Sequence, residues 1–417
     1  MIKIKLNNLL YICVTIITIV LLTPLFTRNA VFLFFLVSII LFFNILFMLI
    51  KSKYILKNYK LIFFTVIWVI ILLFYKIIGY SSTSIGNLFN YIKFYFILIV
   101  ALFFLEKNNN IHKKRIIKIA WFVIFLNMIS NIMLISKYKN ANTLIMIKGN
   151  QFLKTNIGSV GFISLIFVFS LIMLLIFFTN NNIKYRIYSI ISYILAFYLL
   201  IFKYRRATTS LLLVLFSSFF FIAYFFKKIK SKQKIIFGFF LGIGSILFTF
   251  FLIFVLAKYF KIGRLLIRIE WIKDLIFGNL DIKIIGQNSL STRLYLIIGT
   301  VQTWLSSLKS FLFGVGDNLR STNSIDEMFK LTGIGYHSDL VDILGTNGLL
   351  GGLFFYGILY RVYKIIIERY EKEDVNYVKI VFLGFLASIL MNHNLGSELG
   401  IVMLFMLPYI NILKLYI

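Results

Sequence analysis

Cysteine and histidine are scarce in this chain. Its 417 residues include one cysteine, Cys13, and three histidines, His112, His337 and His393. A single cysteine excludes an intrachain disulfide and a cysteine-based metal site. The histidines lie in different predicted loops, and none has the spacing of a His-x-x-His or HExxH motif. The sequence therefore predicts no metal site and no cofactor.

Charge is also scarce. Charged residues make up 14% of the chain and hydrophobic residues 61%, and the mean hydropathy is +0.95. Such a composition excludes a water-soluble globular protein. Apolar runs long enough to cross ~30 Å of hydrocarbon recur along the chain, without the alternation of a membrane barrel. The fold class predicted is an all-α polytopic membrane protein, with residues 1–417 as a single transmembrane domain.

The apolar runs predict about 12 membrane-spanning helices. They cover residues 9–26, 31–50, 61–78, 91–105, 117–135, 160–179, 188–202, 210–226, 235–256, 340–360, 378–389 and 401–415. Two of these runs are short, which leaves eleven spans or a re-entrant segment open. Lysine and arginine are concentrated in the short loops on the side of the N-terminus, so both termini are predicted to be cytoplasmic. The first run lacks a small-residue cleavage site and is expected to be an uncleaved helix.

Acidic residues are few, since 14 Asp and Glu face 44 Lys and Arg, and the net charge is +30. In a soluble protein this charge would suggest nucleic acid as a partner. Here the basic loops satisfy membrane topology and meet anionic headgroups, and no basic surface is interleaved with base-stacking aromatics. The predicted partner is therefore the membrane lipid, with no nucleic acid.

One long loop, residues 257–339, is predicted to lie on the external side between the ninth and tenth spans. Loops of this length usually form a lid or a binding surface. An amphipathic pattern over residues 264–277 predicts a helix in the headgroup plane. A second helix is predicted over residues 291–312, with Ser289 or Ser291 as its cap and a glycine at its end.

Three arginines are predicted on the external side. Arg205 and Arg206 lie in KYRRAT, a tight turn between the seventh and eighth spans, and Arg293 lies in SLSTRLYL, in the first turn of the second loop helix. An arginine beside the hydrocarbon is a functional hypothesis by default, and its planar fork suits phosphate oxygens. The alternatives are that Arg205 and Arg206 extend to the interface, and that Arg293 is a solvated loop charge.

His337 lies where the long loop rejoins the membrane, in IGYHSDLVDILG. A histidine there suits a general base, and the alternative is a helix-entry residue bonded to nearby backbone. Asp339 and Asp342 are expected near a helix start, where the helix dipole favours them, and Asp342 is a candidate to orient an arginine. Their spacing does not put them on the face of His337, which disfavours paired-carboxylate hydrolysis. His393 and Glu398 are also predicted to face outward, without an assigned role.

Glycines punctuate the segment after His337. They are Gly345, Gly348, Gly351 and Gly352. Small residues at spacings of three and four let transmembrane helices approach closely. The glycines are therefore predicted to pack the histidine-bearing helix against its neighbours.

Four motifs follow one another between residues 202 and 360. They are an arginine before a span (RRATTSLLLVLF), Ser-x-Arg in the long loop (STRLYLIIGTVQTW), a Gly-x-Gly turn (FGVGD), and a histidine leading into Gly-x-x-Gly (HSDLVDILGTNGLLGG). In order, spacing and common side they resemble the bacterial O-antigen polymerase and ligase family. The resemblance implies a bacterial inner-membrane enzyme that makes O-antigen of lipopolysaccharide, or capsule. It also implies metal-independent glycosyl transfer from an undecaprenyl-diphosphate-linked oligosaccharide, with a chain-length regulator protein as a possible partner.

The candidate residues suit that reaction. Arg206 and Arg293, with Arg205, would hold the diphosphate, and His337 would take the proton of the acceptor hydroxyl. The segment HSDLVDILGTNG lacks the second His or Glu that ligases of the family often have, which favours a polymerase. The alternatives are a ligase that transfers glycan to lipid A core, and a flippase or transporter of the lipid-linked sugar. A transporter is expected to show internal repeats and broken helices in both halves.

Overall fold

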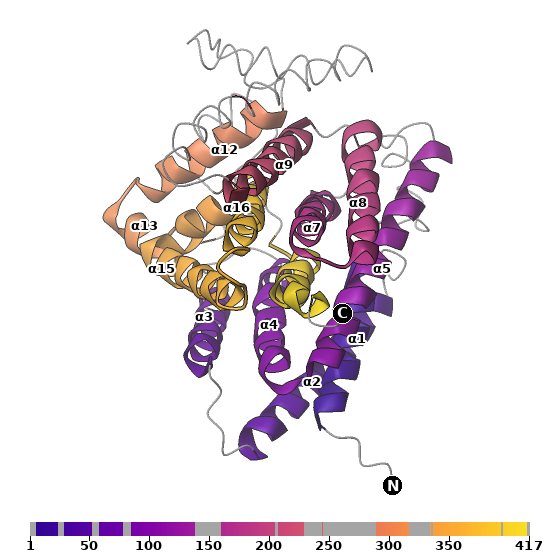
Figure 1. Ribbon diagram of the computed structural model, residues 1–417. Helices are drawn as coiled ribbons and strands as arrows, with labels where there is room; N and C mark the ends of the chain where they lie inside the picture. The colour runs from indigo at the N-terminus through magenta and orange to yellow at the C-terminus, as the bar shows by residue number, and fades with distance from the viewer. Residues whose placement is uncertain are drawn as a thin grey trace.

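The computed structural model describes most of the chain as a bundle of helices (Figure 1). The described residues are 6–23, 29–51, 58–77, 85–137, 160–204, 207–228, 244, 289–316, 334, 337–392 and 395–414. Within these ranges every extended regular element is a helix, in agreement with the predicted fold class.

The helices follow the apolar runs. The N-terminal half contributes α1 (Leu6–Leu22), α2 (Asn29–Lys51), α3 (Tyr59–Ile77), α4 (Ile85–Lys107), α5 (Asn110–Lys137), α7 (Val160–Thr179), α8 (Ile183–Tyr198), the π-helical turn η1 (Leu199–Lys203) and α9 (Ala207–Lys228). The C-terminal half contributes α12 (Ser289–Trp304), α13 (Leu308–Phe313), α15 (Asp339–Ile367), α16 (Val375–Met391), and the continuous segment α17 (Ser397–Ile401), η3 (Val402–Met406) and η4 (Leu407–Leu413). Each predicted run overlaps a helix except 235–256, which lies outside the described residues apart from Gly244. The predicted helix over residues 264–277 also lies outside them.

Six of the described helices, counted from end to end, are long and apolar enough to cross a membrane. They are Phe32–Ile50, Asn110–Ser136, Gly161–Thr179, Ile183–Lys203, Thr208–Phe225 and Asp339–Ile367. Shorter apolar helices at Leu6–Leu22, Tyr59–Tyr75, Val375–Met391 and Glu398–Leu413 accompany them. The chain is therefore a helical protein with the composition of a multi-pass membrane protein.

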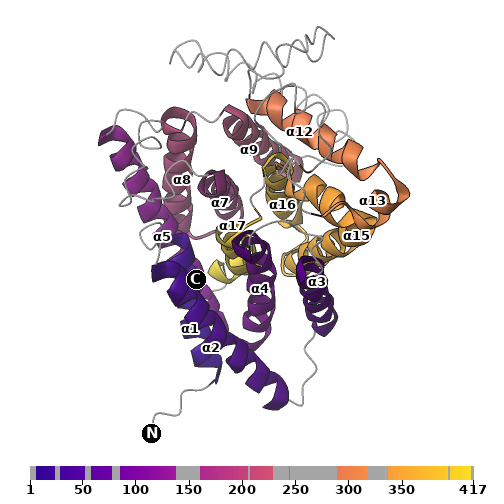
Figure 2. The same ribbon diagram turned by 180° about the vertical axis from the view of Figure 1, so that it is seen from behind.

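Helix α7 lies at the centre of the bundle, with α8, α9, α16 and α17 around it in both views (Figures 1 and 2). Its most apolar window is 83% buried, compared with 33% for α2. A helix that is apolar on all sides is stable in such a position. At one end of α7, Phe178 stacks on Phe220 of α9 and on Tyr377 of α16, with ring centroids 6.0 and 5.8 Å apart. Aromatic contacts thus join the central helix to two of its neighbours.

Hydrogen bonds between side chains tie α5, α8 and α9 together. They run from Trp121 Nε1 to Ser192 Oγ (2.9 Å), from the Tyr204 hydroxyl to Asn131 Oδ1 (2.8 Å), and between the Tyr193 and Ser217 hydroxyls (2.8 Å). Lipid cannot replace these partners, so such bonds favour one arrangement of the helices.

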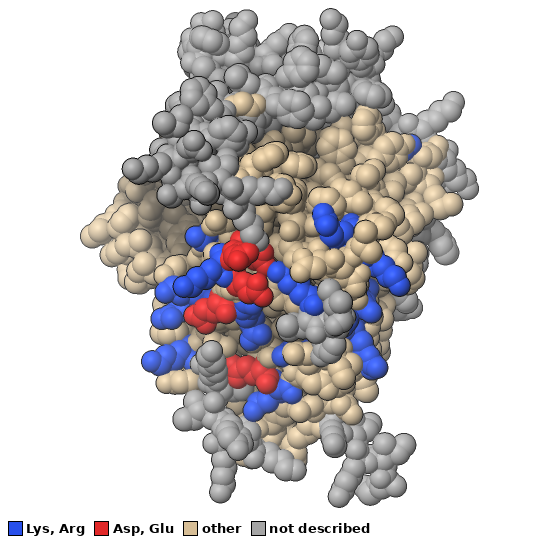
Figure 3. Space-filling model, in the orientation of Figure 1, with Lys and Arg blue, Asp and Glu red and all other residues tan. Residues whose placement is uncertain are grey.

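Charged side chains gather over the middle of one face, around the turn between α15 and α16 (Figure 3). In this turn Asp374 forms an ion pair with Lys414, near the C-terminal end of the chain. The Tyr370 hydroxyl donates a hydrogen bond to the Leu407 carbonyl. Burial, with a further contribution from Asp374, raises the pKa of the Tyr370 phenol well above its ordinary value. Tyr370 therefore stays protonated and keeps η4 attached to the turn.

Helix α15 folds back on itself at Gly348. The backbone there has φ 66° and ψ −165°, a conformation essentially confined to glycine. The Tyr356 hydroxyl donates to the Leu340 carbonyl, although an unbroken helix would hold these positions about 24 Å apart. The prediction of one continuous span over residues 340–360 is therefore wrong. The helix consists of a first half-helix (residues 339–347) and a second half-helix (residues 349–367).

The break in α15 interlocks with the turn that follows α13. The amides of Val315 and Gly316 donate to the carbonyls of Gly345 (2.8 Å) and Thr346 (3.1 Å). Gly314 and Gly316 have φ of 78° and 69°, as expected for the predicted glycine turns. A Cβ atom on Gly314 would lie 2.2 Å from the Thr346 carbonyl oxygen, and one on Gly348 2.4 Å from the carbonyl carbon of Leu312. Carbonyls exposed by the break are thus hydrogen-bonded by a segment from another part of the chain.

The second predicted loop helix is two helices. Helix α12 begins at Ser289, one of the two predicted caps, but it ends at Trp304, and α13 begins after Ser307. Ser307 and Ser310 form a reciprocal capping box at this new start. Serine side chains can replace the hydrogen bonds between backbone groups that continue a helix. The apolar pattern does not include this effect, so it predicted a single helix.

Candidate functional site

The first half-helix begins at a buried polar turn, residues 337–342, which we call the entrance turn. Ser338 is the N-cap, and its Oγ accepts a hydrogen bond from the Val341 amide (3.2 Å). The Ser338 amide in turn donates to Asp342 Oδ2 (2.9 Å). This reciprocal bonding holds the backbone next to His337, whose side chain is half-buried. His337 therefore sits on a rigid support while part of its surface remains accessible.

Asp339 and Asp342 lie in the first turn of the half-helix, as predicted for residues favoured by the helix dipole. Their exposed fractions are only 5% and 1%. Asp339 Oδ2 accepts a hydrogen bond from the Leu395 amide, between α16 and α17. Buried carboxylates require such donors. Asp339 thus joins the entrance turn to the chain before α17, and Asp342 bonds the cap of its own helix.

The structure brings two further charged residues to the same end of the bundle. Lys93 of α4 and Glu398 of α17 are both half-buried, and their opposite charges are close enough to interact. Tyr95, two residues after Lys93, is fully buried and lies within electrostatic range of Asp339. Lys93 was not among the residues predicted for the site. The signal was a lone lysine within the apolar run YIKFYFILIV, since an ionisable residue in a membrane span usually has a function.

The three predicted arginines are less completely described. Arg205 and Arg206 lie outside the described residues, and so does His393. Arg293 lies in the first turns of α12, and only its backbone is described. Position 293 is in helical register with Thr300, seven residues later, at which α12 approaches Gly345 of the first half-helix. The fold therefore places Arg293 on a helix that packs against the first half-helix.

The glycines of α15 divide into two roles. A Cβ atom on Gly345 would lie 2.7 Å from Thr300 of α12, and one on Gly351 would lie 3.0 Å from the Trp68 ring of α3. These close approaches confirm the predicted packing role for Gly345 and Gly351, whereas a Cβ atom on Gly352 would lie 2.5 Å from Leu344 of the same helix. Gly348 differs, because its conformation makes the break itself.

In chemical terms, the entrance turn presents one imidazole beside a helix start that already carries two carboxylates. These acids offset the positive end of the helix dipole, so this N-terminus is a poor site for a phosphate. A half-buried imidazole can accept a proton from a hydroxyl group. Among the described residues, no group of three His, Cys, Asp or Glu side chains is arranged to hold a metal ion.

No protein-family model and no curated protein matches this chain. The functional assignment therefore depends on the chemistry and position of the entrance turn, together with the motifs in the sequence.

The cap of the entrance turn gives a first prediction. Ser338→Ala removes the side-chain acceptor for the Val341 amide, so it should lower the free energy of unfolding by about 1 kcal/mol. Ser338→Thr keeps a hydroxyl and should retain most of the stability. Unfolding of the purified protein in detergent measures both. Equal stability of the alanine variant and the wild type would show that the cap does not hold the turn.

Proposed function

We propose that this chain is a membrane glycosyltransferase that polymerises lipid-linked oligosaccharide repeat units into O-antigen or capsular polysaccharide. The donor is an undecaprenyl-diphosphate-linked oligosaccharide, and transfer needs no metal. The observation that carries this proposal is the entrance turn, which holds a rare, half-buried histidine on a rigid, buried helix start. The motif order that resembles the O-antigen polymerase and ligase family supports the same function.

In the proposed reaction, His337 takes the proton of the acceptor sugar hydroxyl as its oxygen attacks the anomeric carbon of the donor. The bond from that carbon to the lipid diphosphate breaks, and the diphosphate leaves with the bonding electron pair. A diphosphate is already a good leaving group, so cations that hold it are more useful than a strong acid. Arg206 and Arg293, with Arg205, supply these cations. The helix dipole at the entrance turn does not hold the diphosphate, because the two carboxylates already offset its positive end.

We also propose a membrane topology. The chain would cross the inner membrane of a bacterium about 12 times, with both termini in the cytoplasm and residues 257–339 as the external loop. Its support is that described helices follow the predicted runs, and that α15 enters the bundle at the end where Asp339, Lys93 and Glu398 gather. A chain-length regulator protein is a further proposed partner.

A deletion strain tests the function. Loss of a polymerase should leave surface lipid that carries a single repeat unit. Loss of a ligase should leave polymerised glycan on its carrier lipid, and loss of a flippase should trap unpolymerised units inside the cell. Either of the last two phenotypes would reject the polymerase.

A transporter of the lipid-linked sugar is the second candidate, because helices in both halves of the chain depart from regular α-helical geometry. Helix α8 continues as the π-helical turn η1, α15 breaks at Gly348, and α17 continues into π- and 3₁₀-helical segments. Discontinuous helices are typical of transporter binding sites. Proteoliposomes with a labelled lipid-linked sugar separate the two candidates, since only a transporter would move the label across the bilayer without lengthening the glycan.

The arginines give a second prediction. Arg206→Ala and Arg293→Ala should each weaken binding of a diphospho-lipid at least about ten-fold, because each loses charge-assisted hydrogen bonds. Arg186→Ala is the matched control, since Arg186, near the start of α8, packs over the Phe177 ring of α7 with 5.0 Å to the centroid. Titration of a fluorescent diphospho-lipid measures the affinities. Unchanged affinity in both test variants would contradict the role of the arginines.

A further inference from the structure

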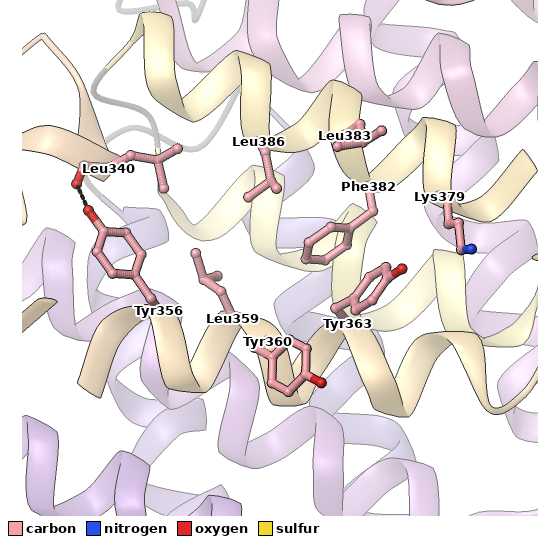
Figure 4. A pocket seen from close by; sticks show the side chains of 9 residues that line it. All are labelled: Leu340, Tyr356, Leu359, Tyr360, Tyr363, Lys379, Phe382, Leu383 and Leu386. Atoms are coloured by element: carbon pink, nitrogen blue, oxygen red, sulfur yellow. Dashed lines mark hydrogen bonds between the residues drawn. The ribbon is translucent and has the colours of Figure 1, made fainter. Parts of the chain in front are cut away.

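An elongated groove lies between the second half-helix of α15 and helix α16. Its volume is about 400 Å³, within the range of small-molecule sites. It is lined by Leu340, Tyr356, Leu359, Tyr360, Tyr363, Lys379, Phe382, Leu383 and Leu386 (Figure 4). We call it the tyrosine groove. None of its lining residues is used by the proposed reaction.

The two ends of the tyrosine groove differ in polarity. One end is closed by Leu340, whose carbonyl accepts the hydrogen bond of Tyr356 (Figure 4). The other end holds Lys379, and the hydroxyl of Tyr363 points toward it (Figure 4). No aspartate or glutamate lines the groove. An apolar channel with an ammonium group at one end matches a ligand that has a hydrocarbon chain and an anionic head.

A second cation lies near the same end. Lys364 Nζ is 5.2 Å from the centroid of the Tyr360 ring, and that ring lines the groove. This end adjoins the turn between α15 and α16, where other charged side chains gather. The lysine distribution of the sequence predicts that this turn faces the cytoplasm. An anionic head at Lys379 would therefore lie at the level of the headgroups of the inner leaflet.

The dimensions of the groove favour a chain confined to one leaflet. From Lys379 to Leu386 the groove follows α16 for about 10 Å, whereas one leaflet supplies about 15 Å of hydrocarbon. Its side is open, because Leu383 and Tyr360 are 54% and 53% exposed. A lipid can therefore enter sideways from the bilayer.

We propose that the tyrosine groove binds one anionic phospholipid of the inner leaflet, with an acyl chain between α15 and α16 and its phosphate at Lys379. The end of the chain lies against Leu340, next to Asp339 in the entrance turn. The bound lipid fills the space between the second half-helix and α16, and so supports the position of the first half-helix.

Native mass spectrometry of the full chain in mild detergent tests this site. The probes are dioleoyl phosphatidylglycerol and, as the neutral-headgroup comparison, dioleoyl phosphatidylcholine. Lys379→Gln should weaken retention of phosphatidylglycerol about five-fold and that of phosphatidylcholine less, because the choline cation offsets the charge of its phosphate. Lys372→Gln, in the turn before α16, is the matched control for loss of one charge and should behave as the wild type.

A second pair of variants tests the acyl chain. Leu383→Trp fills the groove and should reduce retention of both lipids. Leu390→Trp is the matched control, because Leu390 is 40% exposed on the same helix but does not line the groove. Equal retention of phosphatidylglycerol by wild type, Lys379→Gln and Leu383→Trp would overturn the proposal. Displacement of phosphatidylglycerol by an equal concentration of undecaprenyl phosphate would also overturn it, since the groove would then belong to the isoprenoid chain.

Discussion

His337→Ala is expected to reduce the rate of glycan extension at least about 100-fold, because the acceptor hydroxyl loses its general base. Binding of the diphospho-lipid should remain, since hydrogen bonds of Ser338, Asp339 and Asp342 hold the entrance turn. The measurement uses purified protein and lipid-linked repeat units, with product lengths resolved on a gel and donor affinity determined by titration.

His112→Ala is the control for this experiment. His112 stacks on Tyr11 at 4.2 Å and lies by Asn108, near the junction of α4 and α5. It should extend glycan at the wild-type rate. Wild-type product lengths from His337→Ala would reject the general-base role. Thermal unfolding of both variants shows whether any loss of activity reflects loss of the fold.

Gly348→Ala is expected to destabilise the protein by more than about 3 kcal/mol. The φ of 66° with ψ of −165° alone costs an alanine about 1–3 kcal/mol. The new Cβ would also lie 2.4 Å from backbone atoms of Leu312 and Phe313, which cannot move as a flexible side chain can. Either α15 straightens, or the turn after α13 separates from it. The thermal unfolding midpoint in detergent measures the loss of stability.

Gly357→Ala is the matched control in the same helix. No atom lies within 4 Å of a Cβ built at Gly357, and alanine is a better helix former than glycine. Its stability should be unchanged or slightly higher. Equal unfolding midpoints for the two variants would mean that the break at Gly348 is not needed for the folded state.

Hydropathy predicts most helices of this chain because an apolar helix corresponds to one uninterrupted apolar run of the sequence. Residues 160–179 contain no charged residue, and α7 occupies that stretch and the centre of the bundle. The predicted boundaries of the shorter spans were less accurate. Residues 188–202 predicted a short span, whereas α8 with η1 begins at Ile183, after its cap Asn182, and extends to Lys203. The start of that helix is amphipathic, and its charged residues end an uninterrupted apolar run.

The fold-back of α15 could not be predicted in the same way. Residues 345–348 read Gly-Thr-Asn-Gly, which is compatible both with close helix packing and with a break. The choice depends on the amides of Val315 and Gly316, which lie in another part of the chain and satisfy the carbonyls of Gly345 and Thr346. A local sequence pattern does not show which distant amides donate these hydrogen bonds.

The candidate site also has features that were predictable from local sequence and features that were not. Ser338 and the two aspartates form a recognisable helix start, so their positions near the beginning of α15 were predictable. The approach of Lys93 to Glu398 was not, because the two residues lie on helices far apart in the sequence. The roles of Arg205, Arg206 and Arg293 remain predictions from chemistry and chain position.

The hydrogen bonds between residues 314–316 and the break in α15 have a consequence for how the protein is made. Bare carbonyls in hydrocarbon cost several kcal/mol each, so the first half-helix cannot enter lipid by itself during synthesis. The segment that supplies the donors is translated before α15, so these donors exist before the break forms. Formation of the break is then completed by docking onto this earlier segment, and a released chain truncated before residue 345 should leave the amides of Val315 and Gly316 without these acceptors.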